Sequence, residues 1–151
     1  MEIFDTLGFL LGTWNLDRSI EDRQSGTRGS FHGTAVVAVE TGRDRALDGR
    51  ASYDETGELC FGAYTGPASR HLAYAVGPDG GAVLISFADG RPFIDLDLRS
   101  GRSHSVHQCR HDRYELTTIV RSHRVVEEHW HVTGPAKDYD AVTTLVRAIG
   151  I

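Results

Sequence analysis

The stretch LLGTWNLDRSI, residues 10–20, has the alternation of a β-strand with one apolar side. Trp14, Leu16 and Ile20 fall on that side at a period of two, and Arg18 falls there as well. Moving a guanidinium out of water costs several kcal/mol unless a partner compensates for the lost hydration. The sequence therefore predicts that Arg18 meets a carboxylate, a tyrosine hydroxyl or a bound anion inside the fold. The alternative is that the aliphatic part of the Arg18 side chain extends along the apolar face, so that the guanidinium reaches solvent at the edge of the fold.

The chain has 151 residues and a formal net charge of −5. The length suits one domain, residues 1–151, and the negative charge argues against binding to nucleic acid or to an anionic membrane. The opening MEIFDTLGFLLGTW has no basic residues before its short apolar cluster, so we expect neither a signal peptide nor a membrane span, and we expect a cytoplasmic protein. A small-molecule ligand or substrate is the expected partner, and a homodimer is left open.

The two cysteines give no sign of a metal site or a disulfide, whereas the single lysine is a candidate catalytic residue. Cys60 and Cys109 lie far apart without CxxC spacing, which predicts two small buried apolar residues rather than a zinc site or a disulfide. Of the 16 Lys plus Arg residues, only Lys137 is a lysine. An ammonium group can lower its pKa or form an imine, which a guanidinium cannot do, so Lys137 is a candidate catalytic residue. An exposed turn is the alternative for Lys137.

Most of the chain has the pattern of short strands separated by Gly- and Pro-containing turns. Only the opening EIFDTLGFLL has helical spacing. One short helix followed by a long meander predicts an all-β fold, an antiparallel up-and-down barrel of eight to ten or more strands, with a two-sheet sandwich as the alternative. The expected strands lie near residues 13–20, 28–40, 45–54, 58–64, 70–76, 82–88, 93–99, 104–111, 113–121, 124–133 and 138–148.

Gly12-Thr13-Trp14 at the start of a strand, together with Arg147 near the end of the last strand, resembles the GxW and C-terminal arginine signature of the calycin superfamily. That superfamily includes lipocalins and fatty-acid-binding proteins. The resemblance implies that Arg147 covers Trp14 at the closed end of a barrel.

A second resemblance covers nearly the whole chain. It is to domain-of-unknown-function family 6314, a bacterial family of calycin-like proteins, and it implies a barrel but no particular activity. Where the family pattern has a histidine after Arg-Pro-Phe, this chain has Ile94, so no role of such a histidine carries over. The matching motifs are FLLGTW, Tyr53-x-Glu55-x-Gly57, FADGRPF, His107-x-Cys109, Asp112, Trp130-x-Val132-x-Gly134-Pro135 and Lys137-Asp138-Tyr139.

If Trp14 points inward, alternation places polar side chains inside a barrel whose interior is normally apolar. Glu55 also fits a solvent-facing turn, His107 a buried core position, and Arg91 a turn with a solvated head. The candidate acid–base residues are Glu55, His107, Tyr53 and Lys137. The candidate ligand-binding residues are Arg18, Trp14, Tyr64, Arg91, Cys109, Tyr114, Trp130 and Tyr139.

His129 and His131 stand two apart on one strand, a spacing that can chelate a metal. The sequence offers no third ligand at a convincing position, so we expect no metal site.

Two functions fit these residues. The leading hypothesis is a cofactor-independent enzyme whose cavity residues act as acids and bases on an aromatic or polyketide-like metabolite, by cyclisation, isomerisation or amine–aldehyde condensation. The alternative is a non-catalytic carrier of a small anionic amphiphile held by Arg18 and tyrosine. A haem-binding barrel is a further alternative, although the glycine-rich opening of such proteins is missing here. Fold alone does not decide among them.

Overall fold

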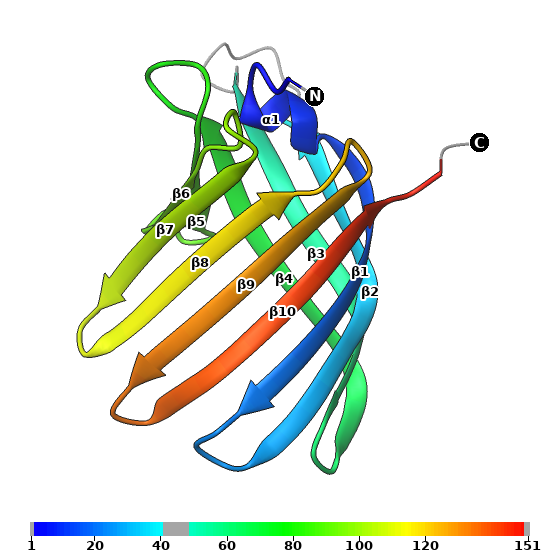
Figure 1. Cartoon of the computed structure of the whole chain (residues 1–151), viewed down its shortest axis with the longest axis vertical. Helices are drawn as coiled ribbons and strands as arrows, with labels where there is room; N and C mark the ends of the chain where they lie inside the picture. The colour runs from blue at the N-terminus through cyan, green and yellow to red at the C-terminus, as the bar shows by residue number, and fades with distance from the viewer. Residues whose placement is uncertain (1, 41–48, 150–151) are drawn as a thin grey trace.

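The computed structural model describes residues 2–40 and 49–149, which form one short helix followed by ten antiparallel strands (Figure 1). The predicted all-β barrel with a single N-terminal helix is confirmed, and the two-sheet sandwich is excluded. The elements are α1 (Thr6–Leu10), β1 (Gly12–Asp22), β2 (Thr27–Val39), β3 (Arg50–Phe61), β4 (Tyr64–Val76), β5 (Val83–Phe87), β6 (Pro92–Leu96), β7 (Arg102–Cys109), β8 (Asp112–Val120), β9 (Val125–Gly134) and β10 (Lys137–Arg147).

The strands form one sheet in the order β6-β5-β4-β3-β2-β1-β10-β9-β8-β7, so the barrel meets itself where β6 faces β7. Side-chain hydroxyls bridge this seam: the backbone N–H of Asp95 donates to Ser105 Oγ at 3.3 Å, and that of Asp97 donates to Ser103 Oγ at 3.2 Å. The barrel is therefore nearly closed, and its last junction depends on serine side chains rather than on a backbone ladder.

The sequence predicts two strands at 45–54 and 58–64, and this is wrong for the described part, because β3 runs without a break from Arg50 to Phe61. Gly57, taken as part of a turn, lies opposite Gly33 of β2. A Cβ on Gly57 would come within 2.2 Å of the His32 carbonyl oxygen, so this glycine permits a close approach of two strands. The turn lies further on, at Gly62. Residues 45–48 lie outside the described residues.

Trp14, α1 and the end of β10 close one end of the barrel. Trp14 is 1% exposed, and its indole N–H donates to the Leu10 carbonyl at 2.8 Å. The Arg147 guanidinium lies 4.2 Å from the centre of the Trp14 ring and donates to the carbonyls of Phe9 and Leu11 at 2.6 and 2.9 Å. The expected pairing of Trp14 with Arg147 is confirmed.

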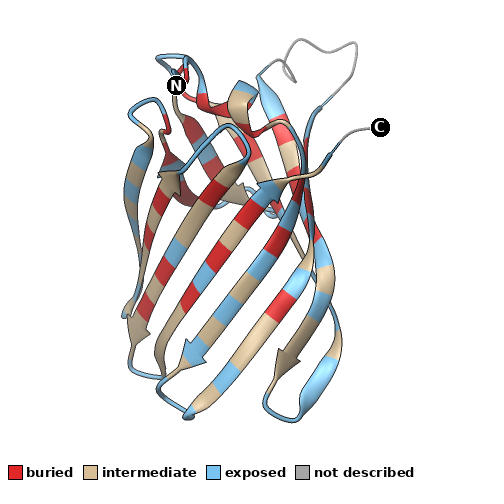
Figure 2. Cartoon of the chain, turned by 45° about the vertical axis from the view of Figure 1, so that its right-hand side comes forward, coloured by how far each residue is buried: buried red, intermediate tan, exposed pale blue. Residues whose placement is uncertain are grey.

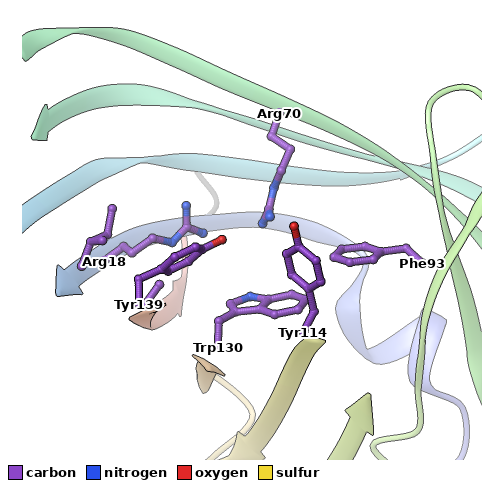
Figure 3. A pocket seen from close by; sticks show the side chains of 8 residues that line it. Arg18, Arg70, Phe93, Tyr114, Trp130 and Tyr139 are labelled. Atoms are coloured by element: carbon purple, nitrogen blue, oxygen red, sulfur yellow. The ribbon is translucent and has the colours of Figure 1, made fainter. Parts of the chain in front are cut away.

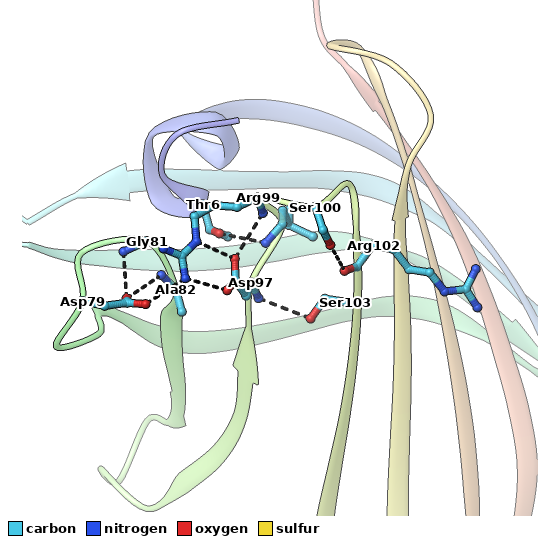
Figure 4. Close-up of polar contacts among 10 residues, drawn as sticks. Thr6, Asp79, Gly81, Ala82, Asp97, Arg99, Ser100, Arg102 and Ser103 are labelled. Atoms are coloured by element: carbon cyan, nitrogen blue, oxygen red, sulfur yellow. Dashed lines mark hydrogen bonds and ion pairs between the residues drawn. The ribbon is translucent and has the colours of Figure 1, made fainter. Parts of the chain in front are cut away.

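Polar contacts fasten α1 to the loops beside it (Figure 4). Thr6 donates its backbone N–H to the Gly81 carbonyl, and its hydroxyl accepts from the Leu98 N–H. Arg99 joins the same corner by pairing with Asp79 and Asp97 at 2.8 and 2.7 Å. The helix is thus held against both the β4–β5 and the β6–β7 connections.

Buried positions concentrate in the half of the barrel near α1, and the opposite hairpin ends are more exposed (Figure 2). The half near α1 is filled by aliphatic and aromatic side chains, among them Leu7, Leu10, Leu16 and Leu98. The polar interior residues lie between this core and the hairpin ends. The fold therefore places a solid apolar base beneath a polar middle section.

Within residues 2–40 and 49–149, no helix has the length and apolar character needed to cross a membrane.

We expect Arg147→Ala to lower the free energy of unfolding by about 2 kcal/mol, because it removes charge-assisted hydrogen bonds and a cation–π contact from the closed end. Urea unfolding followed by tryptophan fluorescence measures the change. Arg147→Lys should recover only part of it, since an ammonium cannot fork to two carbonyls. The matched control is Arg102→Ala at an exposed strand position. Equal effects of Arg147→Ala and Arg102→Ala would contradict the role assigned to Arg147.

Candidate functional site

Arg18 and Glu55 form a bidentate ion pair inside the barrel. Arg18 Nη1 donates to Glu55 Oε2 at 2.9 Å, and Nη2 donates to Oε1 at 2.8 Å. Arg18 Nε donates to Thr143 Oγ1 at 2.7 Å. Tyr53 donates its hydroxyl to Glu55 Oε1 at 2.7 Å. Glu55 is 4% exposed, so the solvent-facing turn considered for it is wrong. Arg18 meets the carboxylate that its place on an apolar strand face predicts.

The environment of Glu55 fixes its charge. Burial works to raise its pKa, but the hydrogen bonds and charges of Arg18 and Arg70 outweigh burial and hold the pKa at about 2. Burial also raises the pKa of Tyr53, so this phenol stays protonated and acts as a donor. Glu55 is thus a permanent anion at neutral pH, held by three side chains.

Next to this pair lies a cavity of about 190 Å³ that opens to solvent (Figure 3). Phe93 and Trp130 stack with 5.4 Å between ring centres and 7° between ring planes, and Tyr114 meets the edge of Phe93. Figure 3 shows Arg70 reaching from β4 toward Trp130 and Tyr114 on the opposite wall. The cavity is lined by Arg18, Ile20, Arg70, Phe93, Tyr114, Trp130, Tyr139 and Ala141.

Two buried N–H groups on this lining lack acceptors. Arg70 Nε and Trp130 Nε1 have no hydrogen-bond partner among the described residues. The remaining link of Arg70 to protein is weak, with 3.5 Å between Nη2 and Glu55 Oε1. Because buried donors are almost always paired in folded proteins, two unpaired donors on one small cavity call for an acceptor within it.

Glu128 on β9 is a further interior carboxyl. It shares the inward face with Val126 and Trp130, and its register partners are Thr118 of β8 and Thr143 of β10. Burial raises the pKa of Glu128, while the charges of Arg18 and Arg70 and the nearby Trp130 indole N–H, which does not reach hydrogen-bond geometry, work to lower it. Among the described residues, none forms an ion pair with Glu128 within 4.0 Å. The two interior glutamates therefore have opposite tendencies: Glu55 ionises readily and Glu128 resists ionisation.

Residues 10–147 match a family described as a family of unknown function, DUF6314. The chain belongs to this family. Comparison with curated protein sequences finds no match.

Two solved structures resemble the barrel. One is an S-type phycobiliprotein lyase, CPES, from Guillardia theta, with a TM-score of 0.68, 11% identity, and coverage of 100% of this chain and 95% of that chain. The other is a protein of unknown function from the DUF3598 family of Nostoc punctiforme, with a TM-score of 0.60 and 14% identity. This second match covers 95% of this chain and 49% of the other. At these identities the likenesses concern the fold.

Four of the eight expected ligand-binding residues line the cavity: Arg18, Tyr114, Trp130 and Tyr139. The other four lie elsewhere. Trp14 fills the closed end, and Tyr64 is 50% exposed with its hydroxyl donating to the Pro67 carbonyl. Arg91 is exposed and paired with Asp89 at 2.7 Å. Cys109 is exposed and Cys60 is half-buried, so the expectation of two buried cysteines is wrong.

The expected acid–base residues fall into three separate places. Tyr53 and Glu55 contact each other beneath the cavity. His107 packs edge-on against Phe93, with 5.3 Å between ring centres. Lys137 sits by the β9–β10 hairpin, where Nζ donates to the Tyr114 hydroxyl at 2.6 Å and pairs with Asp112 at 3.1 Å. The hydrogen bond to Tyr114 and the charge of Asp112 raise the pKa of Lys137, which opposes the neutral amine that an imine requires.

Arg70, Phe93 and Glu128 were not expected from the sequence. The alternation that starts at Trp130 also turns Glu128 inward, so this signal was present in the sequence. Arg70 stands directly opposite Glu55 in the β3–β4 ladder, and only the strand register reveals that pairing. His129 and His131 point outward, and His131 pairs with Asp140 at 2.6 Å. No group of three metal-ligating side chains is arranged to hold a metal within the described ranges.

We expect Arg18→Met to lower the free energy of unfolding by about 3 kcal/mol, because it leaves the Glu55 anion buried with the neutral Tyr53 hydroxyl and only a long contact to a cation, Arg70. Glu55→Gln alone should also destabilise. In the double variant Arg18→Met/Glu55→Gln the two losses should not add, and the coupling energy from urea unfolding should be about 2 kcal/mol or more. Additive losses would show that the ion pair contributes little.

The pKa of about 2 for Glu55 predicts how acid affects the protein. A carboxyl whose pKa is lower in the folded than in the unfolded chain stabilises the fold above the unfolded value, and that stabilisation is lost as the pH falls through the folded value. The difference in unfolding free energy between the native chain and Glu55→Gln should therefore be about 3 kcal/mol at pH 7. It should shrink between about pH 4.5 and about pH 2.

Glu58→Gln is the matched control, because Glu58 is exposed on the same strand. Its effect should stay below about 0.5 kcal/mol throughout the series. A Glu55→Gln effect that does not change with pH would contradict the assigned ionisation.

Proposed function

We propose that this barrel binds a small, flat organic anion between Arg70 and the aromatic wall formed by Phe93, Trp130 and Tyr114. The observation that carries the proposal is the pair of buried donors, Arg70 Nε and Trp130 Nε1, which lack acceptors among the described residues and border the same cavity. An anionic oxygen supplies the acceptor that such donors require, and a guanidinium binds carboxylate-like groups through paired hydrogen bonds.

The walls favour a planar ligand. Aromatic side chains prefer to pack against the faces or edges of other rings, and this lining offers four aromatic side chains beside two arginines. The volume of about 190 Å³ lies below the roughly 300–1,000 Å³ of cavities that enclose drug-sized ligands. The expected ligand is accordingly small, with one or two rings.

The charges of the interior also favour an anion. The charges of Arg18 and Glu55 compensate each other at 2.8 Å. Arg70 lies 3.5 Å from the same carboxylate, so its own charge is compensated only in part. Burial raises the pKa of Glu128, which favours its neutral form and makes it a weak counter-charge for Arg70. A bound anion restores neutrality in a region where water is scarce and unpaired charge is costly.

Non-catalytic binding or carriage fits these contacts better than acid–base catalysis. Glu55 is a poor proton donor or acceptor near neutral pH, because its carboxylate is held by Arg18 and Tyr53. His107 and Lys137 both contact Tyr114, and among the described residues no hydrogen bond joins either of them to the Tyr53–Glu55 pair. Among the barrels of similar fold, one is a phycobiliprotein lyase, and at 11% identity it supports the barrel shape without specifying a ligand.

Fluorescence titration with naphthalenesulfonate, a flat anion, tests the proposal. The native chain should bind it more tightly than the neutral naphthalenesulfonamide. Arg70→Met should weaken binding of the sulfonate by about tenfold or more, since charge-assisted hydrogen bonds contribute about 1.5–3 kcal/mol. The same variant should change binding of the sulfonamide by about twofold at most.

Arg28→Met is the matched control, because Arg28 is an exposed arginine near the start of β2. It should leave both affinities unchanged. Equal affinity of the native chain for the sulfonate and the sulfonamide, or equal losses in Arg70→Met and Arg28→Met, would overturn the proposed anion site.

A further inference from the structure

The contact between Lys137 and Tyr114 lies at the cavity but has no part in the anion site proposed above. Tyr114 lines the cavity from β8, and Lys137 Nζ donates to its hydroxyl at 2.6 Å. We infer that Tyr114, positioned by Lys137, binds a second oxygen acceptor on the ligand, so that the site takes a flat aromatic anion that also carries a carbonyl group. The inference rests on the proposed function and names the ligand class of the same site.

Residues of two strands hold the Lys137 ammonium in place. It pairs with Asp112 Oδ2 at 3.1 Å, and Asp112 and Tyr114 stand two apart on β8, which places both side chains on one face. Gly134, the register partner of Lys137, leaves room for Asp112, since a Cβ at this glycine would clash with the carboxylate. The ammonium is therefore fixed beside the Tyr114 hydroxyl.

The direction of this hydrogen bond leaves the Tyr114 proton free to be donated. An ammonium only donates, so the phenol oxygen is the acceptor in the contact with Lys137. Within residues 2–40 and 49–149, no protein group accepts a hydrogen bond from this hydroxyl. Figure 3 shows the hydroxyl directed toward Arg70, and a guanidinium cannot accept. The proton therefore points to an oxygen of solvent or ligand in the cavity.

The lining as a whole favours a ligand that accepts hydrogen bonds. Arg70 Nε and Trp130 Nε1 lack acceptors, Tyr114 adds a third donor, and none of the described residues that border the cavity has a carboxylate. A carbonyl oxygen only accepts, whereas a ligand hydroxyl or amine brings protons that need acceptors of their own. The Lys137 ammonium also polarises the phenol, because hydrogen bonds in a chain strengthen one another.

Isothermal titration calorimetry with two sets of naphthalenesulfonates tests the inference. One set carries an acetyl group at each ring position in turn. The other carries an isopropenyl group, which has the same shape without the oxygen. The native chain should bind at least one acetyl isomer about fivefold more tightly than its isopropenyl counterpart, as expected for one hydrogen bond.

Tyr114→Phe should abolish this preference, because it removes the hydroxyl and keeps the ring. It should change the affinity for unsubstituted naphthalenesulfonate by about twofold at most. Lys137→Met should reduce the preference to about twofold or less, and Lys137→Arg, which still offers a donor to the phenol, should retain more of it. Since the two ligands of a pair have the same shape, the ratio of their affinities reports the hydrogen bond and not the shape of the cavity.

Tyr139→Phe is the matched control, because Tyr139 is the other phenol on the lining and no cation among the described residues donates to its hydroxyl. It should keep the preference. Loss of the preference in Tyr139→Phe with its retention in Tyr114→Phe would overturn the assignment to Tyr114. An unchanged preference in Lys137→Met would rule out the positioning role of Lys137.

The same titrations separate this inference from the anion site. A native chain that binds naphthalenesulfonate but prefers no acetyl isomer contradicts the second acceptor and leaves the anion site standing. Absence of binding by every sulfonate overturns the anion site and the second acceptor together.

Discussion

Arg18 and Glu55 form the ion pair around which the polar middle of the barrel is arranged. Either charge alone would be unfavourable so deep in the fold, and the bidentate geometry, with support from Thr143 and Tyr53, makes the pair tolerable. The pair links β1 to β3 across the interior, so it limits where these strands and their neighbours can place other side chains. Because Arg18 and Glu55 already bind each other, a ligand in the cavity must be bound by the neighbouring groups, such as Arg70 and Trp130.

The two tryptophans show how one strand pattern serves different ends of the barrel. Trp14 and Trp130 both point inward, but Trp14 lies in the apolar base, where Leu10 accepts its N–H and Arg147 covers its ring. Trp130 lies at the level of the cavity, and its N–H has no acceptor within the described part of the chain. The packed apolar core near α1 stabilises the fold. The neighbouring layer of the interior can therefore contain a cavity and unpaired donors.

The sequence was enough to predict the barrel, the pairing of Trp14 with Arg147 and the interior position of Arg18, because period-two alternation and a few fixed residues carry that information. It was not enough to define the cavity. A glycine such as Gly57 can form a turn or can let two strands approach closely, and the sequence does not distinguish these roles. The sequence therefore predicts two strands in place of β3, with Glu55 next to a turn. Arg70 was missed because its meaning depends on standing opposite Glu55, and strand register cannot be inferred from one strand alone. Glu128 could have been found from Trp130, since the same alternation turns both inward.

Closure of the barrel is what turns these separate side chains into one site. Arg18, Glu55, Arg70 and Trp130 come from β1, β3, β4 and β9, and in the sheet order four strands separate β4 from β9. Arg70 and Trp130 therefore meet across the lumen and not along a ladder. The distance between those walls depends on how the sheet edges meet at β6 and β7, where Ser103 and Ser105 supply side-chain acceptors for backbone donors. Two modest hydrogen bonds far from the ion pair thus help to fix the width of the cavity, since side-chain bridges allow a different spacing from the regular ladder of about 4.8 Å.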